Sequence, residues 1–499
     1  MRMRWTKRTR WIAVAAVIAT LLGGVGWFWV GSFLPGTYSV MSMGYPDLGG
    51  GLPPMNMADM PAMPNMPGQI SVADLTDSET AAPDVGITLV ARQESIRLAS
   101  GQRVAGYTLN HQSPGPTIVA TQGELLQVTL VNESVKAGVT LHWHGVDVPN
   151  ADDGVAGVTQ DAVPVGGRFV YRFRVNDAGT YWYHSHQDSH VQIPGGLYGA
   201  LIVQPKVAVA PAEHEVIAAL HTYGKLRTIN GSTGVRRLDV PAGTLVRTRV
   251  IDTDSDAAQV AITGAAFRVV AIDGHAVNQP TDITRKSVVV PAGGRIDFTF
   301  TVPDGVAVRV DLSGGAALAI GPAGSAEAAV STGVAFGTLD LLSYGSPAPL
   351  GFDPSHPDRR FDYRIGQRYG FVDGKPCYCW TVNGHLYPNV PMFEVNEGDV
   401  VVMTISNDTG MNHPIHLHGH HAVVLSRDGV PATGSPWWVD SLNADGSTYV
   451  IAFLADNPGI WMDHCHNLPH AADGLVTHLA YIGVTEPYRI GGPAKNHPE

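Results

Sequence analysis

Two stretches that lie far apart in this chain repeat each other position by position. Residues 116–135 match residues 391–410, and a second match joins residues 179–190 to residues 459–470. Repetition of this kind indicates one structural unit that is used more than once. It limits the chain to architectures that contain at least two equivalent domains.

A third copy of the unit lies between these two. Residues 260–274 align with residues 415–429, but Ala261 and Thr263 stand where the later copy has histidine. The middle copy therefore keeps the framework of the repeat and lacks the histidines that its neighbours carry.

From residue 85 onward, short β-patterned runs such as Leu125–Val131 and Val400–Ile405 alternate with Gly, Asn, Asp and Pro. The 57 glycines and 35 prolines suit short strands and tight turns better than long helices. The pattern predicts all-β sandwich or barrel domains. We expect three of them, at residues 85–206, 212–345 and 360–490.

Ten of the 21 histidines fall in four short motifs, each of which contains an H-x-H pair. The motifs are HWHG at 142–145, HSH at 184–186, HPIHLHG at 413–419 and HCHNLPH at 464–470. Because residues i and i+2 of a strand point to the same face, each pair aims two imidazoles in one direction. A single pair often lies on the surface and binds no metal, whereas four pairs in two matching domains indicate a centre for Cu, Zn, Fe or Ni.

Cys465 narrows the choice of metal. It lies between His464 and His466 on the opposite strand face, where it can join His413 and His470 in the trigonal His₂Cys set of a blue-copper site. The remaining histidines of the H-x-H pairs then form a separate cluster. These are His142, His144, His184, His186, His416, His418, His464 and His466.

The four motifs, in this order, resemble those of the three-domain multicopper oxidases, the laccase-like family, over nearly all of residues 85–490. The resemblance implies three consecutive cupredoxin-like Greek-key domains and four copper ions. It assigns type 1 copper to His413, Cys465 and His470, type 2 copper to His142 and His416, and the type 3 pair to His144, His184, His186, His418, His464 and His466. The type 2 and type 3 ions would form a trinuclear centre between the first and third domains.

The family resemblance also implies a reaction. Four one-electron oxidations of a small reductant would be coupled to the reduction of dioxygen to two waters, with electrons passing through Cys465. A phenol or aromatic amine would make the enzyme laccase-like, and Cu⁺ or another metal ion would make it a metal-defence oxidase. A non-catalytic protein that only sequesters copper is the alternative from another class of function. The complete ligand set argues against it, because such a protein need not keep every ligand.

Some positions near these motifs are expected to differ from the family pattern or to have no ligand role. Leu475, ten residues after Cys465, occupies the position compared for axial ligation and cannot coordinate, which predicts a three-coordinate type 1 site with a relatively high reduction potential. His190 aligns with His470 but is expected to be a neighbouring or surface residue. His420 and His421 are expected to pack beside the ligands.

Reduction of dioxygen also consumes protons. Asp153 matches a position where the family carries an acidic residue near the type 2 copper, and it is our candidate for proton delivery; an Asp-Gly turn residue is the alternative. Pro469 stands where many bacterial relatives have a glutamate. A proton route through that side chain is therefore absent, and Asp463 or Asp473 could substitute.

Five basic residues lead into an apolar, uncharged run at Trp11–Leu34. The run is long enough to cross a bilayer of about 30 Å as a helix. It predicts a cytoplasmic stub and a membrane anchor over residues 1–34, with the rest of the chain on the extracytoplasmic side. A long cleaved signal peptide, followed by secretion, is the alternative.

Residues 35–84 are predicted to form a linker rich in Met, Pro and Gly. Its methionines either collect Cu⁺ through their thioethers or belong to a flexible spacer. They are Met41, Met43, Met55, Met57, Met60, Met63 and Met66.

Charge and cysteine content narrow the remaining possibilities. The net charge of −12 argues against nucleic acid as a partner, because phosphate recognition needs a basic face. The expected partners are dioxygen, the reductant and a membrane. Three cysteines allow at most one internal disulfide, and the pair Cys377 and Cys379 is predicted to form it, with a Cu⁺-thiolate site as the alternative.

Overall fold

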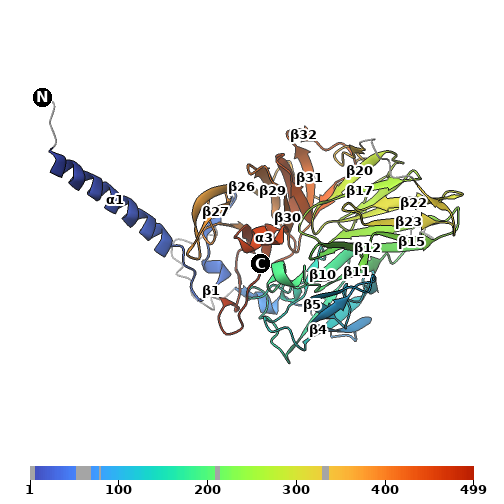
Figure 1. The fold of residues 1–499 in the computed structure, drawn as a ribbon, viewed down its shortest axis with the longest axis horizontal. Coiled ribbons are helices and arrows are strands. Elements are labelled where there is room, and N and C mark those ends of the chain that lie inside the picture. Colours follow the sequence, from blue (N-terminus) through green and yellow to red (C-terminus); the bar gives the residue numbers. More distant parts are fainter. Residues whose placement is uncertain (1–5, 52–68, 78–79, 208–213, 329–335) are drawn as a thin grey trace.

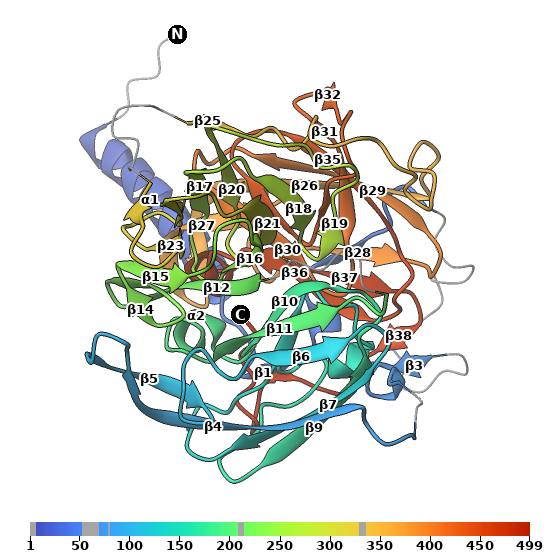
Figure 2. The same ribbon diagram turned by 90° about the vertical axis from the view of Figure 1, so that its right-hand side faces the viewer.

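The structure is a computed structural model that describes residues 6–51, 69–77, 80–207, 214–328 and 336–499. Strands dominate it and form three successive pairs of sheets (Figure 1, Figure 2). The predicted all-β class is therefore confirmed. A single long helix projects from this body at the N-terminal end (Figure 1).

The first pair of sheets spans residues 85–204. One sheet has the order β6 (Ile118–Thr121), β11 (Tyr198–Gln204), β10 (Gly179–His184) and β8 (His142–His144). The other has the order β5 (Arg103–Leu109), β4 (Val85–Arg97), β7 (Leu125–Asn132) and β9 (Arg168–Arg174). Leu126, Val128 and Leu130 of β7 are fully buried in one core, as the two-residue period of a strand requires.

The second pair spans residues 214–338. One sheet has the order β14 (Ser232–Thr233), β13 (Leu226–Ile229), β12 (His214–Tyr223), β16 (Leu245–Asp252), β21 (Arg295–Thr301), β18 (Arg268–Ile272) and β19 (His275–Ala276). The other has the order β15 (Val235–Asp239), β23 (Ala317–Gly321), β22 (Val306–Asp311), β17 (Ala258–Thr263), β20 (Lys286–Val290) and β25 (Gly337–Thr338), with β24 (Ala326–Glu327) beside β22. Val260 and Ile262 of β17 face the core, so Ala261 and Thr263 lie on its other face.

The third pair contains residues 359–481 and one strand from the N-terminal region. One sheet has the order β2 (Tyr45–Asp47), β28 (Pro391–Val395), β37 (Val476–Tyr481), β36 (Ile460–Cys465), β30 (His413–Leu417) and β34 (Ser441–Ala444). The other has the order β27 (Lys375–Val382), β26 (Arg359–Val372), β29 (Val400–Asn407), β35 (Tyr449–Leu454), β31 (Ala422–Arg427) and β32 (Val430–Pro431), with β33 (Trp438–Val439) beside β31.

Short elements complete the described fold. They are the strand pairs β1 (Thr37–Tyr38) with β39 (Ile490–Gly491) and β3 (Ile70–Ser71) with β38 (Val484–Thr485), the helices α2 (Ser189–Gln192) and α3 (Leu468–Ala472), and the one-turn 3₁₀ helices η1 (Val40–Ser42), η3 (Val72–Asp74) and η4 (Asn150–Asp152). The helices α2 and α3 follow the HSH and HCH motifs, so the repeat seen in the sequence extends into helical turns that contact each other.

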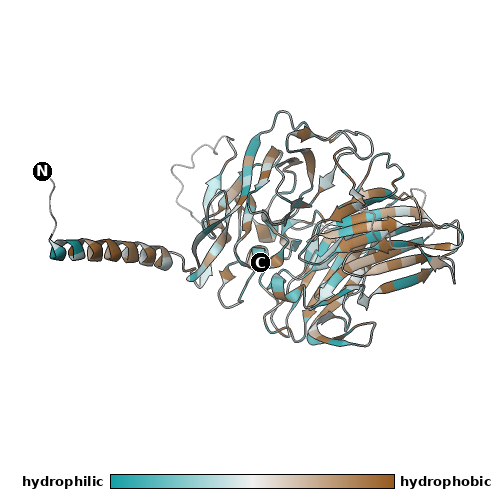
Figure 3. Ribbon diagram, turned by 45° about the horizontal axis from the view of Figure 1, so that its top comes forward, coloured by the Kyte–Doolittle hydropathy of each residue, from teal (hydrophilic) through white to brown (hydrophobic). Residues whose placement is uncertain are grey.

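The N-terminal helix α1 covers Lys7–Val30, and none of its described residues is buried. Its surface is apolar along most of its length (Figure 3), and it is long enough to cross a membrane. A signal sequence has the same properties. The end of the helix lies against the turn between β26 and β27, where the Trp29 indole donates a hydrogen bond to the Gly374 carbonyl oxygen at 2.9 Å.

Part of the segment expected to be a linker is ordered against the third pair of sheets. Strand β2 pairs in parallel with β28, and Val40 and Met43 are buried in the core of that pair. Strands of two or three residues are too short to produce a visible hydrophobic period, which is why the sequence did not indicate them. Met55, Met57, Met60, Met63 and Met66 lie outside the described residues.

Cys377 and Cys379 are joined by a disulfide, as predicted, and Cys465 is a free, buried cysteine. The disulfide lies within β27, on the hairpin that β26 and β27 form. A thiolate metal site at this pair is thereby excluded in the oxidised chain, and the third cysteine stays available as a ligand.

Candidate metal centre

The four H-x-H pairs lie on, or at the ends of, two pairs of neighbouring strands, and each pair of strands belongs to a different sheet. In the first sheet, β8 and β10 pair antiparallel with His142 opposite His184. In the third pair of sheets, β30 and β36 pair antiparallel with His416 opposite His464. The second histidine of each motif is two residues further on and shares its face, so the register places four imidazoles on each of the two facing surfaces.

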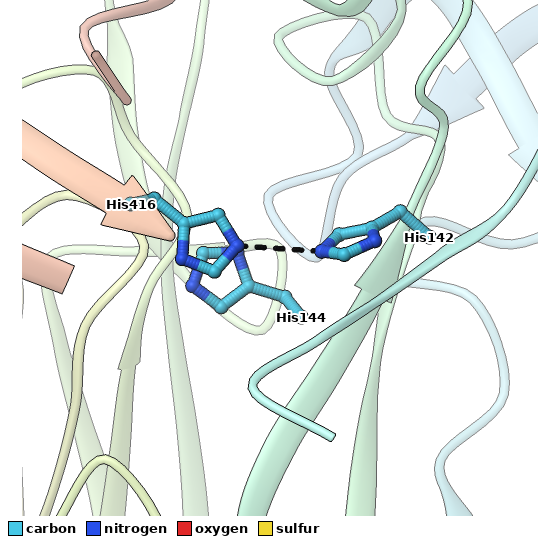
Figure 4. Close-up of side chains that lie close together, drawn as sticks. All are labelled: His142, His144 and His416. Atoms are coloured by element: carbon cyan, nitrogen blue, oxygen red, sulfur yellow. Dashed lines mark hydrogen bonds between the residues drawn. The ribbon is translucent and has the colours of Figure 1, made fainter. Parts of the chain in front are cut away.

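These eight imidazoles meet in three buried groups whose ring nitrogens lie within 4.8 Å of one another. The groups are His142, His144 and His416; His144, His184 and His466; and His186, His418 and His464. Figure 4 shows the first group, in which the His142 and His416 Nε2 atoms are 3.3 Å apart and the His144 ring stacks on that of His416. Every group takes residues from both the first and the third pair of sheets.

The donor chemistry of this cluster suits a metal ion. Both ring nitrogens of His186 and of His466 are buried and have no hydrogen-bond partner, although buried polar atoms normally have one. Burial lowers the pKa of His144, His184, His186, His416, His418, His464 and His466. Neutral imidazoles keep the lone pair that a metal needs, so these residues fit copper.

Hydrogen bonds on the far side of the rings hold several of them in place. His416 Nδ1 lies 2.8 Å from the backbone oxygen of Asp440, and His184 Nδ1 lies 3.0 Å from that of Ser185. An Nδ1–H that donates outward leaves Nε2 as the inward lone pair. Backbone oxygens thereby select the ring nitrogen of His184 and of His416 that faces the cluster.

Asp153 is fully buried and connects the two halves of the cluster. Its Oδ1 atom lies 3.0 Å from His142 Nδ1, and its Oδ2 atom lies 3.1 Å from His418 Nδ1. Burial raises the pKa of this carboxyl, against the opposing effect of His142. Asp153 is also a turn residue, because Gly154 follows with a φ of +78° and a Cβ there would meet the Leu141 carbonyl oxygen at 1.8 Å.

A second site lies on the opposite face of β36, where the structure brings His413, Cys465 and His470 together. The Cys465 Sγ atom is 3.6 Å from His413 Nδ1 and 3.8 Å from His470 Nδ1, and the two Nδ1 atoms are 3.2 Å apart. Burial lowers the pKa of His413 to about 4 and raises the pKa of the Cys465 thiol. The site therefore holds neutral imidazoles and a thiol that needs a metal ion in order to ionise, which fits a His₂Cys copper site.

The surroundings of this site are largely apolar. The Trp380 ring packs against His413 and His470, with centroids 4.8 Å and 4.4 Å away. Leu475 is fully buried and accepts a hydrogen bond from the Cys465 backbone N–H. His470 is 8% exposed, whereas His413 and Cys465 are fully buried. His470 is therefore the most accessible of the three residues.

A cavity of about 500 Å³ lies close to this site, because its wall contains Trp380, whose ring packs against His470, and Ala471, which follows His470 in the chain. Tyr38, Tyr378 and Tyr387 add aromatic surface, and Asp473 adds a carboxylate. The cavity is large enough for a single aromatic ring with substituents.

Two charged residues that the motifs did not reveal support the larger cluster. Arg295 of the middle pair of sheets forms a two-pronged ion pair with Asp440, with N–O distances of 2.5 Å and 2.6 Å. The Asp440 Oδ1 atom lies 3.2 Å from His144 Nε2. Burial alone would raise the pKa of Asp440, but the Arg295 charge holds it well below its usual range.

The middle repeat, which carries no H-x-H pair, thus touches the cluster. A Cβ at Gly293 would meet His144 Cε1 at 2.7 Å and His466 Cδ2 at 3.0 Å, so only glycine fits there. Gly145 has a φ of +82°, and a Cβ there would lie 2.0 Å from the Arg295 guanidinium. The final glycine of the HWHG motif is the one local signal for this ion pair, and it does not identify the partners.

The other singled-out residues lie outside these groups. His190 lies on α2 beside Glu499, and His420 Nε2 lies 2.7 Å from the Tyr481 hydroxyl. His421 Nδ1 lies 3.3 Å from an Asp147 carboxylate oxygen. The remaining positions are Pro469 in α3, Asp463 buried in β36 with an unpartnered Oδ1, and Asp473 at the cavity.

Comparison with known proteins places this geometry in context. Two family models described as multicopper oxidase match residues 91–208 and 360–482. The multicopper oxidase MmcO of Mycobacterium tuberculosis is 29% identical over 480 residues, which cover 82% of this chain and 90% of that protein. Laccase-1 of Botryotinia fuckeliana is 29% identical over 483 residues, covering 82% and 83%.

A solved structure shows the same architecture. The crystal structure of a multicopper oxidase from Pseudomonas thermotolerans superposes on this chain with a TM-score of 0.65 at 27% identity. The match covers 79% of this chain and 98% of that one. The likeness confirms the predicted cupredoxin-like architecture over most of both chains.

Proposed function

This chain belongs to the multicopper oxidase family and is a copper-dependent oxidoreductase that uses dioxygen, and from that premise we propose that its reductant is a phenol or an aromatic amine. The observation that carries the proposal is the cavity beside His470, whose wall contains Trp380, Tyr378 and Tyr387. An aromatic reductant can stack on these rings while its edge approaches the imidazole.

The family carries one type 1, one type 2 and two type 3 copper ions. We assign type 1 copper to His413, Cys465 and His470, type 2 copper to His142 and His416, and the type 3 pair to His144, His184, His186, His418, His464 and His466. Copper bound at these residues would supply a one-electron acceptor near the cavity, and the four ions together would supply the four electrons that reduce one dioxygen to two waters.

The chain's own residues link the two sites and serve the reductant. Cys465 is joined through its peptide bonds to His464 and His466, so the path from the thiolate to both imidazoles consists of a few covalent bonds. Trp380 packs against the His413 and His470 rings and also lines the cavity, so it lies between the reductant's space and the copper ligands. We propose that the Asp473 carboxylate in the cavity wall accepts the hydroxyl proton of a phenol.

Steady-state kinetics test the choice of reductant. The copper-loaded full chain should oxidise four phenol molecules to phenoxyl radicals for each dioxygen reduced to two waters. Asp473→Asn should lower kcat/KM for the phenol about 100-fold with the blue absorption unchanged, whereas Asp353→Asn, at an exposed site, should change neither. A kcat/KM for Cu⁺ or Fe²⁺ far above that of any phenol would overturn the proposal.

A metal ion is the second candidate reductant, and one observation favours it. His190, His497 and Glu499 lie together in the wall of the same cavity and offer nitrogen and oxygen donors. Four one-electron oxidations of such an ion, with one dioxygen and four protons, yield four oxidised ions and two waters. The kinetic comparison above separates the two candidates.

Asp153 is proposed to hold the His142 and His418 rings in position and to supply protons to the buried cluster. Asp153→Asn keeps the size of the side chain but removes the negative charge that both Nδ1–H groups face. We expect reoxidation of the reduced enzyme by dioxygen to slow about 10- to 100-fold. Stopped-flow measurement of the returning blue absorption checks this, and an unchanged rate would count against Asp153.

Leu475 is proposed to leave the type 1 copper three-coordinate. Leu475→Met introduces a thioether, which should lower the reduction potential of the site because a fourth ligand favours the oxidised ion. A redox titration followed by the blue absorption measures the shift. Leu479→Met, at another buried leucine, should leave the potential where it is. Equal potentials in all three proteins would contradict the assignment of this position.

We propose that α1 anchors the catalytic domains to a membrane on its extracytoplasmic side. An uncleaved anchor should remain with the membrane pellet after extraction at alkaline pH, and the protein should retain residues 1–34 by intact mass. A mature protein that begins after residue 34 would identify the segment as a signal sequence instead.

A further inference from the structure

Four side chains with metal-binding groups meet away from the predicted copper sites. Asp188 and His190 lie at the start of α2, and His497 and Glu499 come from the last residues of the chain. The Glu499 Oε1 atom is 2.6 Å from His190 Nδ1 and 2.8 Å from His497 Nδ1. His497 Nδ1 is also 2.8 Å from the Asp188 Oδ1 atom. The four residues are therefore joined in one chain of short contacts, from His190 through Glu499 and His497 to Asp188.

Two of these ligand atoms are buried and form ion pairs, but neither makes a hydrogen bond of acceptable geometry. The Glu499 side chain is 9% exposed, and its Oε1 atom has no hydrogen-bond partner of acceptable geometry although both imidazoles lie beside it. His190 Nδ1 is likewise buried and makes no hydrogen bond. Buried carboxylate oxygens are costly unless a hydrogen bond or a cation satisfies them.

The backbone holds Asp188 in an unfavourable conformation at the same point. Asp188 has a φ of +49°, in the left-handed region that residues other than glycine seldom occupy. Its carboxylate reaches His497 from there, and the Ser189 N–H lies 3.2 Å from the other carboxylate oxygen of Glu499. Strain of this kind is found where the position of a side chain matters.

We propose that Asp188, His190, His497 and Glu499 bind one divalent first-row transition-metal ion. Two imidazole nitrogens and two carboxylates suit Fe²⁺, Mn²⁺, Zn²⁺ or Cu²⁺, whereas Cu⁺ prefers sulfur donors. The donor atoms are now 2.6–2.8 Å apart. Ligands of one ion at about 2.0–2.2 Å stand roughly 3 Å or more apart, so small side-chain shifts would admit the ion.

The charge balance of the cluster agrees with this proposal. The hydrogen bond to Asp188 and the Glu499 carboxylate beside it raise the pKa of His497 to about 10, and Glu499 raises the pKa of His190. Burial would raise the pKa of Glu499, but the two imidazoles bring it below its usual value. Protonated imidazoles thus occupy the place of a cation, and a metal ion would displace their protons.

The location gives the ion a functional setting. His190, His497 and Glu499 line the cavity that reaches Trp380 and Ala471 beside His470. An oxidisable ion bound there would lie in the space proposed for the reductant. The site therefore adds a binding place for the ion to the second candidate function, the oxidation of a metal ion. Any role of the site in turnover rests on that function. Binding of the ion itself does not depend on that reaction.

Isothermal titration calorimetry of the copper-loaded full chain with Zn²⁺, which carries no electrons to the enzyme, tests the site. We expect one Zn²⁺ to bind per chain, and His497→Gln and Glu499→Gln each to weaken binding at least about tenfold. His356→Gln is the matched control, since His356 also pairs with a carboxylate but is 87% exposed and distant in the chain; it should leave Zn²⁺ affinity unchanged.

The possible outcomes distinguish a failure of the proposed metal site from a failure of the proposed oxidase function. The blue absorption of every variant shows whether it is folded and copper-loaded. Absence of Zn²⁺ binding, or equal affinity in the wild type and both variants, overturns the metal site. Zn²⁺ binding that these variants abolish, in a protein that oxidises neither phenols nor Fe²⁺, supports the site and overturns the proposed function instead.

Discussion

Replacing Cys465 by serine is expected to abolish the blue absorption and to lower kcat/KM for a phenol at least about 1000-fold, equivalent to about 4 kcal/mol of barrier. Cys465 supplies the only sulfur of the His₂Cys group, and burial opposes its ionisation unless a metal ion binds. A serine hydroxyl ionises far less readily and has no soft sulfur to offer copper. Absorption and EPR spectra of the copper-loaded variant, together with oxygen consumption, measure the effect.

A double variant of the other cysteines provides the control. Cys377→Ser with Cys379→Ser removes the disulfide in β27 but leaves His413, Cys465 and His470 in place. Its blue absorption should persist. An intense blue absorption in Cys465→Ser would refute the assignment of the type 1 copper to this group.

The second large effect is expected from Arg295→Met. The Arg295 side chain is fully buried and forms the two-pronged ion pair with Asp440, while its Nη1 atom lies 3.5 Å from Asp273. Methionine keeps much of the volume but removes the guanidinium that pairs with Asp440 and faces Asp273, and it leaves His421 as the remaining cationic partner of Asp440. Breaking a buried pair in this way costs about 3–5 kcal/mol of unfolding free energy.

Denaturant unfolding of the variant measures that loss. The exposed pair of Arg268 with Asp282 supplies the comparison, since Arg268→Met should change stability by no more than about 0.5 kcal/mol. The copper content of the buried cluster should also fall in Arg295→Met, because Asp440 contacts His144 and holds His416 through its backbone oxygen. Equal unfolding free energies in the two variants would contradict this account of the ion pair.

The ion pair of Arg295 with Asp440 also determines the direction in which stability changes with pH. The pKa of Asp440 is lower in the folded chain than in the unfolded chain, so the pair contributes its full stability above the unfolded value. That contribution to stability is lost as the pH falls through the lower pKa that Asp440 has in the folded chain. Wild-type protein should therefore lose more stability on acidification than Arg295→Met loses.

Much of the candidate site could be predicted because its signals are local. An H-x-H pair in a strand aims two imidazoles one way, and Cys465 between two histidines must face the other way. The repeat then indicated that two domains supply matching pairs. The structure brings those side chains together in the groups that these rules indicate, although the copper assignments themselves stay predictions.

The parts that the sequence did not indicate depend on contacts between distant segments. Arg295 reaches Asp440 across two pairs of sheets, and Glu499 meets His190 across most of the chain. Strand β2 joins the third pair of sheets through backbone hydrogen bonds that almost any residue can make. None of these contacts leaves a periodic pattern along the chain.

The sequence by itself determined the strand class, the repeat, the histidine pairs and the cysteine between two of them, because side-chain direction along a strand follows from its two-residue period. Only the tertiary structure decided which pairs face each other, which charges stabilise them, and where the cavity opens beside His470. Those features follow from how whole sheets pack, and sheet packing is set by contacts summed over many residues rather than by any short motif.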